Sequence, residues 1–322
     1  MAFSWFLNPR QRFALSESCG VVWKLLDSPY LHFFMNLQLA RVDRALFLAA
    51  LLFSFWPGSA RAQDPQGPTG AAPPSPSAQP APVQDQISAV PNRPTFSTTA
   101  ESVQPGVFEI EYGFELADGH QNINGLVKFG ATDNLELRFA NNPIERDSGT
   151  AGFGDSGAGF KYKIFGQKTW RPTFSVLYSA TIPTATRNVG VGAIGHSAGI
   201  LASKDFGQHH FDFNETVQWV GRPGAGGFDR NYFTALAYSH ALRGKWGMTA
   251  EIAGFSWTNT ANPATMTLMG AAVYSVSPRL ILDTGLYVAA YGQLPRVTFF
   301  GGVTYSIADL YQRRGKGTSS PH

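Results

Sequence analysis

One glycine-rich stretch, residues 190–199, holds the patterns most suggestive of chemistry. Residues 195–199 read Gly-His-Ser-Ala-Gly and match the G-x-S-x-G pattern of serine hydrolases, in which a sharp strand-to-helix turn exposes the serine. Residues 190–195 match G-x-G-x-x-G, a pattern that binds a dinucleotide phosphate at a helix N-terminus. Because residues 198–205 favour a strand rather than a helix, we expect both matches to be products of chance in a glycine-rich chain.

Histidines offer two further candidate sites. A lipid hydrolase on a barrel wall needs a base within hydrogen-bond reach of a serine, and His196, Ser197 and His240 are the available residues. Adjacent strand residues point to opposite faces, so His196 cannot easily pair with Ser197. Near residue 210, only His210 and Asp212 share a face, and two ligands do not make a metal site. We predict no enzyme activity, no metal and no other cofactor, with a lipid hydrolase kept as the weakest alternative.

The elements that position these residues follow from a two-residue alternation that recurs to the end of the chain. Residues 107–116 read Val-Phe-Glu-Ile-Glu-Tyr-Gly-Phe-Glu-Leu, which places apolar side chains on one face and glutamates on the other. Such a strand needs an apolar environment on one face and an aqueous environment on the other. We expect an all-β protein, a transmembrane antiparallel up-and-down β-barrel of about 12 strands. The strands are predicted at 107–116, 121–131, 133–142, 155–165, 171–182, 194–205, 208–220, 229–242, 245–257, 264–277, 279–290 and 296–307.

Short and long connections divide the predicted strand ends into two groups. Short turns of outer-membrane barrels face the periplasm and longer loops face outward. We therefore place outside the longer connections at 143–154, 183–193, 221–228, 258–263 and 291–295. Aromatic side chains near strand ends fit the interfacial girdles of such barrels; they are Trp170, Trp219, Tyr232, Trp246, Trp257 and Tyr311. Glu215 falls on the lipid face, which predicts either a β-bulge or a position near an interface.

Composition agrees with a membrane barrel rather than a cytosolic protein. The chain has 34 glycines, 13% aromatic residues and only 15% charged residues, and its formal net charge is +3. Basic residues are scattered, so we predict no nucleic-acid partner. Cys19 is the only cysteine and lies upstream of the predicted mature chain. Disulfides, thiolate metal sites and cysteine catalysis are thereby excluded for that mature chain.

Residues 1–62 are predicted to be an N-terminal extension and a signal peptide. Arg41 and Arg44 precede an apolar run at 46–56, and small residues before Ala62 supply a cleavage signal. The run is shorter than the about 20 residues of a membrane-spanning helix, so cleavage after Ala62 is favoured over anchoring. Because a conventional signal peptide would begin at Met35, we expect translation to start there.

Three further segments complete the predicted organisation. Residues 63–94 are rich in Pro, Ala, Gln, Gly and Ser and cannot bury enough surface to fold, which predicts a disordered periplasmic tether. The alternative is that this segment folds back as a plug in the barrel. Residues 95–311 form the predicted barrel. Residues 312–322 form a polar, basic tail, which we expect to be solvated in the periplasm.

Several short blocks resemble the bacterial outer-membrane family named for the meta-pathway of phenol degradation, often called transporter-like. They are Phe96-Ser-Thr-Thr with Gly106-x-Phe108-Glu109-Ile110-Glu111-x-Gly113, then Leu135-Glu136-Leu137-Arg138, then residues 155–163, and then Pro172 with residues 179–184. The resemblance runs from about residue 94 to 307 and implies an outer-membrane barrel without catalytic residues. Ala185 departs from it, since the family's glycine is expected after Pro-Thr.

The alternation also predicts which charged side chains point into the barrel. They are Glu109, Glu111, Lys128, Glu136, Arg138, Lys161, Lys163, Asp212, Glu251 and Asp283. We expect them to line a channel or transporter for small solutes, hydrophobic or aromatic compounds among them. A closed structural or sensing barrel is the alternative. The expected partners are outer-membrane lipid, a small-molecule solute and the outer-membrane assembly machinery.

Overall fold

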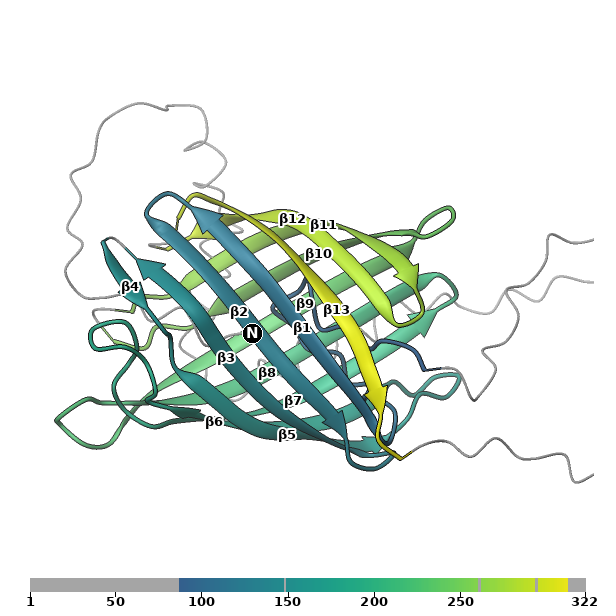
Figure 1. The fold of residues 1–322 in the computed structure, drawn as a ribbon, viewed down its shortest axis with the longest axis horizontal. Helices are drawn as coiled ribbons and strands as arrows, with labels where there is room; N and C mark the ends of the chain where they lie inside the picture. Colours follow the sequence, from purple (N-terminus) through teal and green to yellow (C-terminus); the bar gives the residue numbers. More distant parts are fainter. Residues whose placement is uncertain (1–86, 148, 260–261, 293–294, 312–322) are drawn as a thin grey trace, which may run out of the picture. The chain divides into compact units, whose positions relative to one another are not determined.

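The computed structural model describes residues 87–147, 149–259, 262–292 and 295–311 (Figure 1). The predicted signal peptide, the start of the predicted tether and the basic tail lie outside these ranges. Thirteen strands are found in the described residues: β1 (Val107–Ala117), β2 (His120–Gly130), β3 (Leu135–Asp147), β4 (Thr150–Gly152), β5 (Ser156–Phe165), β6 (Thr173–Ile182), β7 (Gly195–Phe206), β8 (His209–Gly221), β9 (Phe228–Ala241), β10 (Trp246–Phe255), β11 (Thr265–Ser277), β12 (Leu280–Tyr291) and β13 (Val297–Asp309). None of the described segments is a helix long and apolar enough to span a membrane.

The strands form a closed antiparallel barrel. The strands of the ring pair in sequence with their neighbours, with β3 pairing directly with β5, and β1 pairs with both β2 and β13, so that the pairing of β2 with β3 closes the ring. The short β4 pairs only with the far end of β3 and stands outside the ring of twelve. The predicted architecture of about 12 strands is therefore confirmed.

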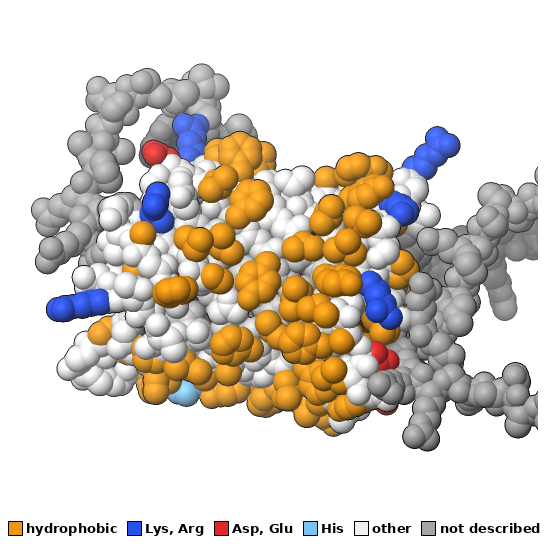
Figure 2. All heavy atoms as spheres, in the orientation of Figure 1, with side chains coloured by type: hydrophobic (Ala, Val, Ile, Leu, Met, Phe, Trp, Pro, Cys, Tyr) orange, Lys and Arg blue, Asp and Glu red, His pale blue; other side chains and the backbone are white. Residues whose placement is uncertain are grey.

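Side chains alternate between the barrel interior and its outer surface as the sequence predicted. In β1, Glu109 and Glu111 are fully buried, whereas Phe114 and Leu116 are exposed. Figure 2 shows hydrophobic side chains covering one face of the wall, with the charged side chains of that face near its two ends. An apolar outside around a polar inside is the arrangement that a lipid bilayer requires of a barrel.

Two details of the wall differ from expectation. The predicted loop at 143–154 is largely a hairpin, because β3 continues to Asp147 and pairs there with β4. A register shift in the facing part of β2, between Ile123 and Gly125, accommodates the longer strand. The prediction of a β-bulge at Glu215 is wrong, since β8 pairs in unbroken register with both β7 and β9. The outward carboxylate instead accepts a hydrogen bond of 2.6 Å from the hydroxyl of Thr234.

Residues 87–106 run inside the ring of strands, and we call this segment the inner collar. It is the dark-blue trace within the barrel in Figure 1. The structure thus differs from the predicted tether for residues 87–94, which are ordered by contacts with the wall, and agrees there with the plug alternative. Hydrogen bonds from successive collar residues reach β1, β10, β8, β7, β5 and β3 in that order. Since this is the order of strands around the ring, the collar makes one lap of the inner wall.

Candidate functional site: the lumen and its inner collar

Wall carboxylates hold the collar by its backbone. Glu109 accepts a hydrogen bond from the Val90 N–H at 2.9 Å, and Glu111 accepts bonds from the Asn92 and Arg93 N–H groups at 3.0 Å each. These glutamates alternate along β1, so both point inward. The first part of the collar therefore follows β1 with its N–H groups turned toward the wall.

Glu251 on β10 grips the collar at its midpoint. Its two carboxylate oxygens accept the Phe96 and Ser97 N–H groups, each at 2.7 Å. On β8, the Asn214 side chain forms two bonds to a single residue, accepting from the Thr98 N–H at 2.7 Å and donating to the Thr98 carbonyl at 2.8 Å. Both backbone groups of Thr98 are satisfied by one amide, which replaces the partners of a β-ladder.

The last part of the collar is fixed by β7, β5 and β3. The Ala100 N–H donates to the Ser203 hydroxyl at 2.7 Å, and Lys161 donates to the carbonyls of Thr99 and Glu101 at 3.1 and 2.5 Å. The Val103 N–H donates to Glu136 at 2.9 Å. Acidic wall groups thus take collar N–H groups, and a wall lysine takes collar carbonyls.

Arg93 is the one collar cation and occupies a seat built by two paired glycines. Gly113 of β1 lies directly opposite Gly302 of β13, and a Cβ on either would stand within 2.1 Å of the guanidinium. The guanidinium binds both oxygens of Asp283, at 3.0 and 3.1 Å, and donates to Asn124 at 3.1 Å. Only glycine leaves room for this group against the wall.

Phe96 fixes the collar to an apolar part of the wall. Its ring meets that of Tyr287 edge to face, with centroids 5.1 Å apart. It packs against two buried clusters on β9 to β13, formed by Phe233, Ala235, Ala253, Met269, Tyr287 and Phe300. An apolar surface inside a membrane barrel is unusual because such lumens are generally polar.

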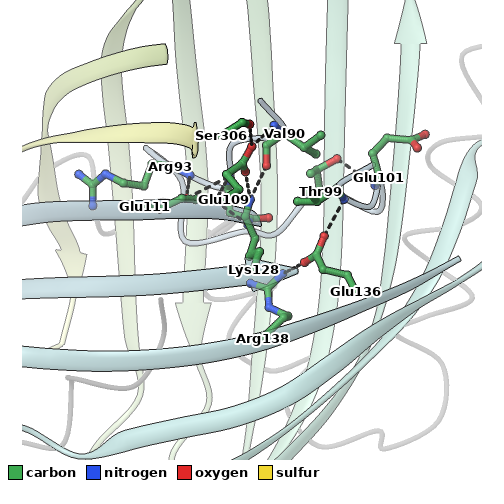
Figure 3. A network of polar contacts seen from close by, with 12 residues as sticks. Val90, Arg93, Thr99, Glu101, Glu109, Glu111, Lys128, Glu136, Arg138 and Ser306 are labelled. Atoms are coloured by element: carbon green, nitrogen blue, oxygen red, sulfur yellow. Dashed lines mark hydrogen bonds and ion pairs between the residues drawn. The ribbon is translucent and has the colours of Figure 1, made fainter. Parts of the chain in front are cut away.

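Buried ion pairs join neighbouring strands beneath the collar (Figure 3). Lys128 contacts both Glu109, at 2.6 Å, and Glu111. Glu136 pairs with Arg138 at 2.9 Å and with Lys161 at 3.3 Å. Burying charges is costly unless they are paired and hydrogen-bonded. Collar N–H groups complete that pairing for the glutamates.

The ten charged residues predicted to line a passage all lie on the inward face, where the collar covers most of them. Glu109, Glu111, Lys128, Glu136 and Lys161 are 0% exposed, Arg138, Asp212, Glu251 and Asp283 are 4–9% exposed, and Lys163 is half-buried. Asp212 accepts from Ser203 at 2.5 Å, and Asp283 holds Arg93. In this structure most of these side chains contact the collar, whereas Asp212 and Arg138 contact other wall residues. Their role in a passage stays a prediction.

Sequence reasoning missed the collar's own residues and their amide and hydroxyl partners. Arg93, Phe96, Asn214 and Ser203 were not among the predicted site residues. One signal was available, since Phe96 and Val103 are isolated apolar residues in a polar stretch just before the first strand. Their wall contacts could not be predicted, because backbone N–H groups have no sequence signature.

The residues weighed for catalysis and metal binding are not brought together. Ser197 points inward and its hydroxyl lies 3.0 Å from that of Ser179, whereas His196 points outward and contacts the Tyr178 hydroxyl at 2.9 Å. His240 lies on the outer wall, stacked on His209. Within the described ranges no group of three or more His, Cys, Asp or Glu residues could hold a metal ion.

Comparison with known proteins supports the barrel on independent grounds. The family model described as "Putative MetA-pathway of phenol degradation" matches residues 91–307, a range that contains most of the collar as well as the strands. No curated protein sequence matches the chain.

Solved outer-membrane channels align with this chain at low sequence identity. The COG4313 outer membrane channel from Pseudomonas putida F1 aligns with a TM-score of 0.52 at 13% identity, covering 64% of this chain and 97% of that one. The NanC porin aligns with a TM-score of 0.48 at 10% identity, covering 62% and 100%. The CymD monoaromatic hydrocarbon channel aligns with a TM-score of 0.36 at 11% identity, covering 64% and 89%. The first of these alignments supports the same outer-membrane barrel fold.

Proposed function

Because this chain belongs to the outer-membrane family described as "Putative MetA-pathway of phenol degradation", we propose that it is a channel for small solutes. The observation that carries the proposal is a closed barrel of twelve strands whose interior is polar and occupied by a separable segment rather than by the wall alone. Eight-stranded barrels are filled by their own side chains, whereas sixteen strands leave an aqueous channel. Twelve strands leave a modest bore, which the collar occupies.

Small aromatic compounds are the solutes that the interior fits best. The apolar surface of β9 to β13 around Phe96 contains aromatic side chains, which can stack against the aromatic ring of a solute. The family description concerns phenol degradation, which is the same class of compound. Cleavage of a signal peptide after Ala62 would deliver the barrel to the outer membrane, and this step belongs to the proposal.

Passage requires the collar to leave its place, since it lies inside the ring of strands and buries the wall groups that it contacts. Six collar N–H groups donate to wall carboxylates, and bonds to charged groups contribute about 1.5–3 kcal/mol each, so complete release costs on the order of 10 kcal/mol. We therefore expect a resting barrel that is closed and opens rarely.

A disulfide between collar and wall tests this proposal directly. The hydroxyl oxygens of Thr99 and Ser203 lie 3.2 Å apart, so the double variant Thr99→Cys/Ser203→Cys places two thiols within bonding reach. Cys19, the only native cysteine, is replaced by serine in all variants. We expect the oxidised variant to lose solute-driven swelling of liposomes and current across planar bilayers, and a reductant to restore both.

The two single-cysteine variants are the matched controls and should respond to neither oxidant nor reductant. Passage through the oxidised double variant at the wild-type rate would mean that solutes pass with the collar in place. A wild-type protein that neither conducts nor swells liposomes, while folded, would instead support a closed structural barrel. The fully buried ion pairs beneath the collar favour that second candidate.

A further inference from the structure

Carboxylates outnumber cations on the inner wall. Among the described strands, eight carboxyl side chains are buried: Glu109, Glu111, Glu115, Glu136, Glu145, Asp212, Glu251 and Asp283. Three wall cations are buried, Lys128, Arg138 and Lys161, and Lys163 is a fourth that is partly buried. These twelve side chains carry an excess of four negative charges, and an excess of three when His210, which contacts Asp212 at 3.0 Å and Asp205 at 2.6 Å, is counted as a cation.

The collar does not correct this excess. Its charged residues are Arg93 and Glu101, whose charges cancel. The wall therefore has the same net charge whether the collar is seated or displaced. Figure 3 shows how the wall cations are already used, with Lys128 between Glu109 and Glu111.

Several wall carboxylates have no lysine or arginine partner on the described wall; one of them, Glu115, lies 3.7 Å from the Nε2 of His120. Both oxygens of Glu251 accept collar N–H groups, and no lysine or arginine among the described residues forms an ion pair with it. Glu115 accepts from the Asn124 amide at 2.8 Å and from the Tyr287 hydroxyl at 3.3 Å. Asp283 has Arg93 as its cation. When the collar leaves, Glu251 and Asp283 lose these donors and face the open lumen.

We propose that the open lumen is selective by charge: it passes cations and uncharged solutes that donate hydrogen bonds, and it excludes carboxylate and phosphate anions. The inference rests on the channel proposed above and specifies its solute class. Water and an entering solute then take the place of the N–H groups and the guanidinium that the collar withdraws, and solutes that donate hydrogen bonds to carboxylates are favoured in the lumen. Cations, phenol hydroxyls and amines can do so, whereas an anion adds repulsion.

Reversal potentials in a KCl gradient test the inference on the full-length protein. The potential of the summed current does not depend on how many channels are open, so rare opening does not prevent the measurement. We expect a several-fold preference for K⁺ over Cl⁻. The double variant Glu115→Gln/Glu251→Gln should lower this preference, and Lys163→Gln should raise it. Liposome swelling should be faster with arginine than with glutamate.

Glu215→Gln is the matched control, since Glu215 lies on the outer wall against Thr234 and should leave selectivity unchanged. Heat-dependent gel mobility confirms that each variant is folded. A preference for Cl⁻, or an undiminished K⁺ preference in the folded double variant, would overturn the charge selectivity while leaving the channel intact. Folded wild-type protein without current or swelling would overturn the channel and the selectivity together.

Discussion

At the scale of single residues, the glycine pair under Arg93 has the most specific role. Gly113 and Gly302 have no side chains, which lets a guanidinium lie against the backbone of β1 and β13 and reach Asp283. Glycine in a strand interior weakens the strand and commonly marks a close approach of another group. Here that group is the guanidinium of Arg93. The two glycines weaken their strands but make room for the buried ion pair between Arg93 and Asp283.

Gly302→Ala should displace Arg93 and leave Asp283 buried without its cation. Removing one partner of a buried pair costs about 3–5 kcal/mol, and we expect a loss of that size in the free energy of unfolding from vesicles. Gly270→Ala is the control, because a Cβ at Gly270 meets nothing within 4 Å. Equal stability of the two variants would show that the guanidinium seat contributes little.

At the scale of elements, the collar is ordered without being a strand or a helix. Its N–H groups donate to side-chain acceptors around the ring. These acceptors satisfy the buried backbone groups in place of the backbone partners that a neighbouring strand would supply. Alternation predicted the strands well because lipid and lumen impose opposite demands on neighbouring residues. It could not predict the collar, whose binding depends on backbone groups that every residue carries.

Hydrogen exchange should reveal this ordering directly. We expect the amides of Val90, Phe96, Ser97, Thr98 and Val103 to exchange slowly, because each donates to a buried wall group. Asn214→Ala should accelerate exchange at Thr98 first, since one side chain holds both of its backbone groups. Fast exchange along the collar of the wild-type protein would contradict a seated segment.

At the scale of the whole molecule, the ring of strands could be predicted from the sequence, whereas the collar that fills the ring could not. Twelve predicted strands match the observed ring closely, and the error at 143–154 arose because β3 and β4 extend beyond it. All ten predicted lumen residues point inward, as strand periodicity requires. Periodicity gives no information on what an inward side chain contacts, so it predicted the residues that face the lumen and left open whether the lumen is filled.

A further prediction concerns the outward face of the barrel wall. Ile252 of β10 is 44% exposed on the outward face, and an arginine on the lipid face near the bilayer midplane costs about 2–4 kcal/mol. Ile252→Arg should therefore lower the free energy of unfolding from vesicles by about that amount. Ala225→Arg, in the exposed 222–227 connection, should have little effect. A tolerated arginine at Ile252 would mean that this face does not meet lipid.

The collar continues directly into β1 at Val107, whereas its other described end, Ile87, is not part of the sheet. A pull applied at Ile87 from the end where β1 begins would break its wall contacts one after another, starting with those of Ala89 to Pro278 and Val90 to Glu109, instead of loading all of them at once. Peeling in sequence needs far less force than shearing the same bonds together. A collar that thermal motion rarely displaces would thus be removed by a small pulling force, provided that the force acts from one side of the membrane.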